Sequence, residues 1–304
     1  MRVQNTFVSN LQFGEDIDAC LEQIQNVRDE IRIEDASRII VNISFGFTSP
    51  CVLTAVTAFL LELKHHCNGN LHCCVNGYED YLSRVNFFQI LNIPYEERFR
   101  RHDEQGRFIP LTHFTREEEV YGFSRRASQV LKTQGAIIDN IIPIVDYSLN
   151  EILGNVFIHA RSPYGAIAFV MTRPKLNITE ICIADSGLGI PNTLRQNPRY
   201  SHLSDLECLE KSLEFGVTGG NGQGNGLYHV RRFIEENRGV FKIYSPRGML
   251  CMNNGNISVC EKHRWQGTLL HMEINRLQFV NVERVYGKDH IPTDVLDYMM
   301  DDLW

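Results

Sequence analysis

Residues 149–160 read LNEILGNVFIHA, a largely apolar stretch in which Glu151, Asn155 and His159 recur at intervals of four. Positions four apart lie one above another on an α-helix, so the three polar side chains would form one stripe. A helix face that meets only water is usually longer and richer in Lys and Glu. The stretch therefore predicts either a partly buried helix whose polar groups are satisfied locally, or a helix that lines a binding site.

A glycine-rich segment, GVTGGNGQGNGL, lies farther along the chain, immediately before a helix predicted to begin near Leu227 and to close at Gly239. Five of its glycines, Gly219, Gly220, Gly222, Gly224 and Gly226, fall within eight residues. Glycine lets a backbone approach a ligand, and a helix N-terminus presents free N–H groups, so together they predict an anion site with phosphate as the usual occupant. The segment lacks the Gly-Lys-Ser or Gly-Lys-Thr of a P-loop, and no parallel βαβ unit surrounds it. A flexible surface loop is the alternative interpretation.

Between these two pieces, AIAFVMTR (166–173) and NITEICIAD (177–185) are predicted strands, and the second runs directly into the sequence DSGLG. Asp185 thus stands at a strand end beside Gly187 and Gly189. A carboxylate accepts hydrogen bonds, so Asp185 in a close-walled pocket could hold an exocyclic amino group such as that of adenine. An ordinary Asp-Gly turn would have the same sequence, so the order of the pieces carries more information than this motif alone.

Four pieces follow one another: Glu151-x-x-x-Asn155, Asp185-x-Gly187-x-Gly189, Gly222-x-Gly224-x-Gly226-Leu227, and Gly267-Thr268 on a late strand. Their order and intervals resemble the ATP-binding domain of the GHKL superfamily, which is shared by gyrase, histidine kinases, the heat-shock-90 chaperones and MutL. The resemblance covers about residues 135–275. It implies a Bergerat-type fold, an α+β two-layer sandwich with a largely antiparallel sheet.

The resemblance also implies a role for each matched residue. Asn155 would ligate a Mg²⁺ ion that bridges the phosphates of ATP, and Glu151 would be the general base of hydrolysis. Asp185 would bind the adenine amino group, and Thr268 would support the adenine through Asp185 or water. His159 has no generic role in the superfamily.

The matched glycines divide into two groups. Gly187 and Gly189 would let the chain pass the base, whereas Gly222, Gly224 and Gly226, with Leu227 after them, would wrap the phosphates. The intervening residues 190–221 have the length of a lid and carry Arg195, Arg199 and Lys211. Because this segment is polar and ends in glycines, we expect it to be mobile without ligand and to lack dense core contacts. Any of these cations could meet a γ-phosphate, although solvated surface charges are the simpler interpretation. No His-Glu-Leu-Arg-type phosphoacceptor segment is present, which argues against two-component histidine kinase activity.

The first part of the chain predicts a small α/β domain over residues 1–112, with a helical connector at 113–134 before an ATP-binding domain at 135–304. Its predicted elements are a helix at 15–33, the strand RIIVNISF (38–45), a helix at 50–66, the strand LHCCVN (71–76), one amphipathic helix at 78–92 and the strand FIPLTHF (108–114). Residues 115–133 also look helical.

Residues 35–95 resemble, more loosely, the STAS domains of anti-sigma-factor antagonists. In that class a Ser or Thr at the start of this helix is phosphorylated, which would be Thr48 or Ser49 here. Ser49 followed by Pro50 is equally a good helix N-cap with Pro in the first turn, so capping alone explains both residues.

The composition limits the remaining classes. The net charge is −7 and no long Lys/Arg run is present, which disfavours nucleic-acid binding. The longest apolar stretches seen, around residues 51–63, fall short of the ~20 residues that span a bilayer, so we expect no membrane segment. The N-terminus lacks a secretory signal and the nine cysteines lack framework spacing, which indicates a cytoplasmic protein. Two His/Cys groups, near 65–74 and 251–263, lack the four-ligand spacing of a zinc site.

The leading functional hypothesis is a Mg²⁺-dependent ATPase whose nucleotide state controls a lid and partner contacts. One alternative is a serine/threonine protein kinase of the anti-sigma switch type, and another is a nucleotide-gated interaction protein without turnover. The expected ligands are ATP and Mg²⁺, and the expected partner is another protein bound through the N-terminal domain. Many GHKL proteins dimerise, so a homodimer is an open alternative.

Overall fold

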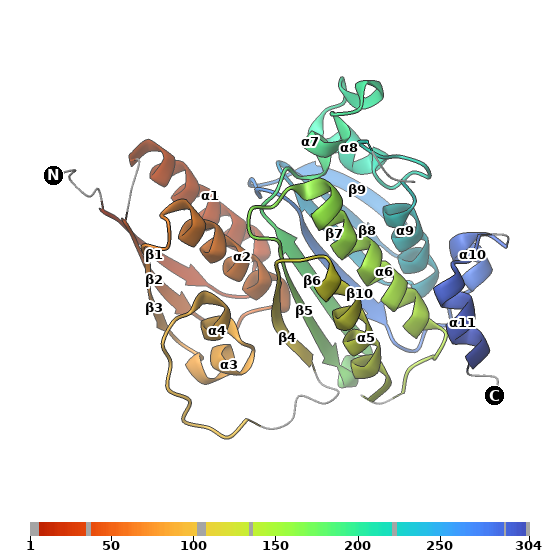
Figure 1. Ribbon diagram of the computed structural model, residues 1–304, viewed down its shortest axis with the longest axis horizontal. Helices are drawn as coiled ribbons and strands as arrows, with labels where there is room; N and C mark the ends of the chain where they lie inside the picture. Colours follow the sequence, from red (N-terminus) through yellow and green to blue (C-terminus); the bar gives the residue numbers. More distant parts are fainter. Residues whose placement is uncertain are drawn as a thin grey trace.

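The computed structural model describes residues 6–34, 38–101, 108–133, 136–220, 224–288 and 290–301, with the side chains of 32–34 and 299–301 excepted. Two sheets organise these residues (Figure 1). One is a three-stranded parallel sheet of order β1-β2-β3, and the other is a seven-stranded antiparallel sheet of order β4-β5-β6-β10-β7-β8-β9. The predicted combination of an α/β part followed by an α+β part with an antiparallel sheet is therefore confirmed at the level of fold class.

The N-terminal unit alternates strands and helices: β1 (Thr6–Phe13), α1 (Ile17–Glu34), β2 (Arg38–Phe45), α2 (Pro50–His66) and β3 (Leu71–Asn76). The predicted bounds of β2, α2 and β3 are confirmed. Strand β1 was not predicted, although alternate residues such as Phe7, Leu11 and Phe13 are buried in the manner of a half-buried strand. Its parallel pairing with β2 needs the long α1 crossover, which supplies one cover of the sheet.

The single amphipathic helix predicted at 78–92 is in fact two short helices, α3 (Glu79–Arg84) and α4 (Phe87–Leu91). The break is at Asn86, which adopts the left-handed conformation with φ 64°. Asn tolerates that conformation better than most residues. The change of direction lets Phe87 bury its whole side chain against Phe45, with ring centroids 5.4 Å apart.

The seven-stranded sheet consists of β4 (Phe108–Phe114), β5 (Ala166–Arg173), β6 (Ile178–Asp185), β7 (Val240–Ser245), β8 (Gly248–Asn253), β9 (Asn256–Glu261) and β10 (Leu269–Asn275). Strand β4 pairs with β5 at one edge, so the domain boundary predicted at residue 112 falls inside a strand of this sheet. The segment predicted as a connector, 113–134, holds the end of β4 and helix α5 (Glu118–Thr133), which packs against β4 and α6.

Helices α5, α6 (Ile141–Asn155) and α9 (Gly226–Asn237) cover one face of this sheet (Figure 1). Helix α6 continues without a break into a π-helical turn, η1 (Val156–Ala160). Two helices that were not predicted, α10 (Val282–Tyr286) and α11 (Thr293–Asp301), follow β10 and pack against α9 and α6 respectively. The remaining short helices are η2 (Pro174–Leu176), α7 (Ile190–Leu194), η3 (Pro198–Tyr200) and α8 (Asp205–Lys211).

Helix α2 covers the opposite face of the large sheet, where it contacts β5, β6 and β10. Successive side chains of a strand point to opposite faces, and β5 shows this directly: Ile167 and Phe169 join the core of the N-terminal unit, whereas Ala168 and Val170 join the core under α5 and α6. The expected two-layer arrangement therefore has a further layer in this chain, because α2 also packs beneath the three-stranded sheet.

The helical stretch Ile141–Ala160 is long and apolar enough to cross a membrane by length and composition, with a mean hydropathy of 1.3. The sequence analysis, which named the apolar stretches around residues 51–63 as the longest, overlooked this one. In the fold, 56% of this stretch is buried, and the core helix of a soluble protein meets the same criterion.

The position of α2 between two sheets predicts a large effect of trimming its core side chains. Leu60 is fully buried, so Leu60→Ala is expected to lower the free energy of unfolding by about 2–5 kcal/mol through lost contacts and a residual cavity. Leu176 is 60% exposed, and the matched change Leu176→Ala should stay within about 0.5 kcal/mol of the parent. Urea denaturation followed by circular dichroism measures both, and equal losses would contradict the placement of α2.

Candidate functional site

A cavity of about 460 Å³ opens between the α6–η1 helix, the end of β6, and the start of α9. Most of the residues singled out by sequence converge on it, and those that line it are Glu151, Asn155, His159, Asp185, Gly189, Gly224, Gly226, Leu227 and Thr268. Gly187 is next to the cavity but does not line it, and Gly222 lies outside the described residues. Motifs spread over more than one hundred residues are thus brought to one place by the fold.

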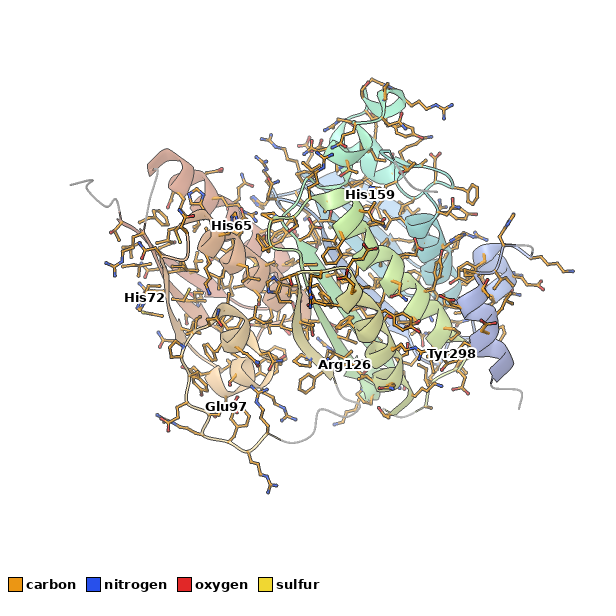
Figure 2. All side chains as sticks on the ribbon, viewed as in Figure 1. His65, His72, Glu97, Arg126, His159 and Tyr298 are labelled. Atoms are coloured by element: carbon orange, nitrogen blue, oxygen red, sulfur yellow. The ribbon has the colours of Figure 1, made fainter. Side chains whose placement is uncertain are left out.

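The polar stripe of the opening stretch lies on α6 and its π-helical continuation. Glu151 and Asn155 keep the α-helical spacing, whereas His159 follows the change to π geometry at Val156. Figure 2 shows His159 at the end of the helix that is nearest α7. Partial burial lowers the pKa of His159, so the imidazole is held in its neutral form near neutral pH. π-helical turns are rare and are often found at functional sites.

Asp185 forms the most buried polar end of the cavity, with 3% of its surface exposed. Its Oδ1 accepts a hydrogen bond of 2.7 Å from the backbone N–H of Gly187, and its own N–H donates to the carbonyl of Thr268 at 2.9 Å. Burial raises the pKa of Asp185 to about 7, and hydrogen bonds from Gly187 and Thr268 only partly oppose this. A buried carboxylate that retains acceptor capacity is suited to a donor group on a ligand.

The glycines after Asp185 are required by close backbone contacts. A Cβ at Gly187 would collide with the carbonyl oxygen of Ala160, and one at Gly189, where φ is +79°, would lie 2.7 Å from Ser245 Oγ. A Cβ at Gly267, where φ is +93°, would collide with the carbonyl of Asp185. These contacts exclude an ordinary surface turn, and they show that the chain at Gly187 packs closely against η1.

Glu151 faces the other end of the cavity, against the first residue of α9. A Cβ at Gly226 would collide with Glu151 Oε2, so the carboxylate lies directly beside the N-terminal turn of that helix. The free N–H groups there carry a partial positive charge that favours an anion. Burial raises the pKa of Glu151, with a hydrogen bond from Tyr147 opposing the shift.

The cavity lining contains no Lys or Arg among the described residues, and its ionisable side chains are Tyr147, Glu151, His159 and Asp185. The three lid cations considered from sequence point elsewhere. Arg195 pairs with Asp205 at 2.6 Å, Lys211 pairs with Glu214 at 2.7 Å, and Arg199 is exposed. The site as it stands is neutral to negative in charge.

The segment expected to be a loosely packed lid is folded over its described part, 190–220. Leu194, Leu209 and Leu213 are buried, and α8 begins with a capping box in which Ser204 and Glu207 each bond the other's backbone. Its end at Val217, Thr218 and Gly219 lines the cavity. The prediction that this segment lacks core contacts is therefore wrong.

Ser49 caps α2, since its Oγ accepts from the N–H of Val52 at 3.4 Å and donates to the carbonyl of Glu15 at 3.2 Å. The capping interpretation of Ser49-Pro50 is confirmed, and phosphorylation of Thr48 or Ser49 stays a prediction.

All nine cysteines are free thiols that form no disulfide. Among the residues that the structure describes, no group of three His, Cys, Asp or Glu side chains is placed to hold a metal ion.

Sequence reasoning missed several residues at the site. Tyr147 extends the Glu151 stripe by one more step of four, a signal that was present in the sequence. Trp265, fully buried, donates its indole N–H to the carbonyl of Asp185 at 3.0 Å.

No protein family, curated protein or solved structure matches the chain. The chemistry of the site therefore has to be argued from its own geometry and from the four motifs.

The raised pKa of Asp185 predicts a pH dependence of stability. The folded-state pKa of about 7 is above the ordinary value of 3.8, so the folded protein retains a proton that the unfolded chain releases between these two values. Stability should therefore fall as pH rises through that window and level off above it, a loss of roughly 4 kcal/mol at about 1.36 kcal/mol per pKa unit. Asp185→Asn cannot ionise and should lack this component.

Urea denaturation of both proteins across the pH range measures the difference. The stability of the parent relative to Asp185→Asn should decline from acid to neutral pH and then stay constant. A difference that is independent of pH would mean that Asp185 keeps an ordinary pKa.

Proposed function

We propose that this protein binds Mg²⁺-ATP in the 460 Å³ cavity and hydrolyses it, with Glu151 as general base. The observation that carries the proposal is the division of one cavity into two chemically distinct ends. A buried carboxylate, Asp185, stands at one end, and Glu151 and Asn155 stand with the glycines of α9 at the other. This division matches a ligand with a hydrogen-bonding base and a polyanionic tail.

The Asp185 end is suited to adenine. Ile152, Ile183 and Leu270 supply apolar lining, and Thr268 lies beside the carboxylate. Pockets for small ligands are commonly apolar with a few placed polar groups that fix orientation. The amino group of adenine would donate to the free acceptor positions of Asp185, most strongly when this carboxyl group is ionised.

The other end is suited to phosphates only with a cation. Gly224, with φ +70°, and Gly226 bring the backbone close to the cavity at the start of α9. Asn155 offers a carboxamide oxygen, a ligand type that Mg²⁺ accepts. Since Glu151 is beside it and the described part of the lining holds no Lys or Arg, Mg²⁺ would supply the positive charge that the phosphates need.

Glu151 has the position and environment of a base. It stands one helical turn from Asn155 and against Gly226, so it would face the same phosphate group that Asn155 addresses through Mg²⁺. Its raised pKa brings the carboxylate nearer the working pH, where a general base is most effective. Tyr147, one turn earlier, would orient it by hydrogen bonding. A partner protein bound through the N-terminal unit, a homodimer and a cytoplasmic location remain predictions from sequence.

Asp185→Asn tests the binding part of the proposal. The change removes the charged acceptor, so ATP affinity should fall about 10- to 150-fold, equivalent to about 1.5–3 kcal/mol. Calorimetry with Mg²⁺ measures it, and Asp139→Asn, at an exposed position away from the cavity, is the control that should leave affinity unchanged. Binding without Mg²⁺ should be much weaker in the parent protein. Equal ATP affinity in all three proteins would remove Asp185 from the site.

Glu151→Gln and Asn155→Ala test the chemistry. Glu151→Gln keeps the shape and removes the base, so turnover should fall about 10²- to 10⁴-fold while ATP affinity changes little. Asn155→Ala should instead weaken Mg²⁺-dependent binding itself. Incubation with γ-labelled ATP, measuring free phosphate and labelled protein together, distinguishes hydrolysis from protein phosphorylation. Binding with neither product would favour a nucleotide-gated interaction protein.

A further inference from the structure

One face of α1 follows the loop that leads into β10. Asp18 pairs with Lys262 at 2.5 Å, and the side chain of Gln25 accepts from the N–H of Arg264 at 2.8 Å. One turn farther on, the guanidinium of Arg28 lies 4.9 Å from the ring centroid of Trp265. An element of the N-terminal unit therefore tracks a loop of the large sheet residue by residue.

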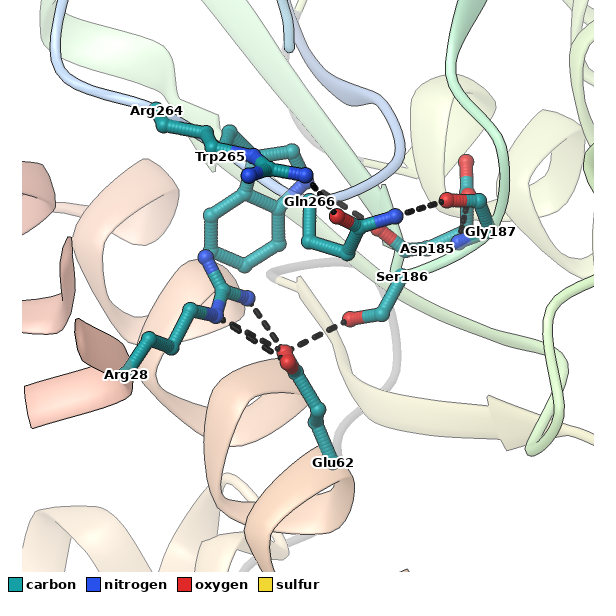
Figure 3. Close-up of polar contacts among 8 residues, drawn as sticks. All are labelled: Arg28, Glu62, Asp185, Ser186, Gly187, Arg264, Trp265 and Gln266. Carbon is teal, nitrogen blue, oxygen red and sulfur yellow. Dashed lines mark hydrogen bonds and ion pairs between the residues drawn. The ribbon is translucent and has the colours of Figure 1, made fainter. Parts of the chain in front are cut away.

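The other side of this loop holds the segment that begins at Asp185. Besides the indole bond of Trp265 to the Asp185 carbonyl, the side-chain amide of Gln266 donates to the carbonyl of Gly187 at 2.7 Å (Figure 3). The backbone N–H of Asp185 bonds to the carbonyl of Thr268. The loop is thus held between α1 and the proposed adenine end of the cavity.

A second connection comes from α2. Glu62 accepts from Arg28 Nε at 3.1 Å, and it also accepts from the hydroxyl of Ser186 at 3.3 Å (Figure 3). Ser186 is the residue immediately after Asp185 and is only 8% exposed. Through Glu62, the N-terminal unit touches the Asp185 segment directly.

The Arg28–Glu62 ion pair is better suited to positioning the Asp185 segment than to stabilising the whole fold. Arg28 is 6% exposed, and its buried Nη1 has no hydrogen-bond partner among the residues that the structure describes. A buried ion pair loses hydration that its attraction often fails to repay, and apolar residues of similar volume are frequently as stable. An ion pair with one unsatisfied nitrogen contributes little to the stability of the contact between the two units. Its directional hydrogen bonds do, however, fix the orientation of the Glu62 carboxylate toward Ser186.

We propose that Arg28 and Glu62 are positioning residues that hold the Asp185 segment in the geometry needed to select adenine. The inference rests on the proposed nucleotide site. It assigns the N-terminal unit a part in base selectivity, although that unit supplies no residue of the cavity lining. Coupling between two binding sites is reciprocal. A ligand or partner that shifts α1 or α2 would therefore change the affinity for adenine, and bound nucleotide would change the affinity for that ligand or partner by the same factor.

The test compares two nucleotides that differ at the group Asp185 would contact. Inosine triphosphate carries a carbonyl oxygen where ATP carries the amino group. The ratio of the two dissociation constants, measured by calorimetry with Mg²⁺ on the full chain, reports the position of Asp185. Glu62→Gln should reduce the preference for ATP about fivefold or more, the lower end of typical coupling between sites.

Ser186→Ala is the second variant, since it removes the single bond from the Asp185 segment to Glu62 and leaves the Arg28–Glu62 pair in place. Its preference for ATP should fall in the same direction, and it decides the matter if Glu62→Gln fails to fold. Asp18→Asn is the matched control. It breaks an ion pair between the same helix and the same loop, away from the Asp185 segment, and should leave the ratio unchanged.

A merely structural role would lower the melting temperature and weaken both nucleotides by the same factor. An unchanged ratio in folded Ser186→Ala, or an equal drop in Asp18→Asn, would overturn the inference while leaving nucleotide binding intact. A parent protein that binds ATP no better than inosine triphosphate would instead refute the assignment of Asp185 in the proposed function, and this inference with it.

Discussion

Helix α2 is buried between the two sheets and supplies side chains to the core that joins them. Residues Pro50 to Leu61 are all buried, because the helix packs beneath the three-stranded sheet and against β5, β6 and β10 at the same time. Strands β5 and β6 are correspondingly buried on both faces along most of their length. Removing the N-terminal unit would expose one whole face of these strands to water, at a cost proportional to the apolar area involved. The two units therefore form one body.

That rigid platform sets the chemistry at the end of β6. Asp185 is the last residue of a strand packed on both faces, so its carboxylate, only 3% exposed, stands at a deeply buried point of the cavity wall. The close contacts of Gly187, Gly189 and Gly267 leave the chain little freedom around it. At the far end, the charged side chain that the described lining supplies is the carboxylate of Glu151, beside the N-terminus of α9. A polyanion would be accommodated there only together with a metal cation. The charge balance of the site would then depend on the bound ion as well as on the protein.

Local pattern predicted those elements whose character is set by near neighbours. The helix at 50–66, the strands at 38–45, 71–76 and 166–173, and the helix after the glycine segment all have strong periodicity and clear ends. Strand β1 was missed because its pairing partner lies across the α1 crossover. The helix break at Asn86 was missed because it is favoured by the burial of Phe87 against Phe45, a tertiary contact. The boundary predicted at residue 112 divides strand β4, because its partner, β5, lies more than fifty residues later in the chain.

Helical periodicity and glycine geometry are local properties, so the positions of the polar stripe on α6, of the Asp185 turn and of the glycines before α9 can be derived from the amino-acid sequence. The folded chain was needed to show that these pieces share one cavity, that Asp185 is buried enough to raise its pKa to about 7, and that no Lys or Arg of the described lining meets them. The same is true of the contacts by which Arg28, Glu62 and Trp265 reach the Asp185 segment. Burial, desolvation and pairing depend on which residues pack together, and residues as distant in sequence as Arg28 and Trp265 come into contact only through the fold.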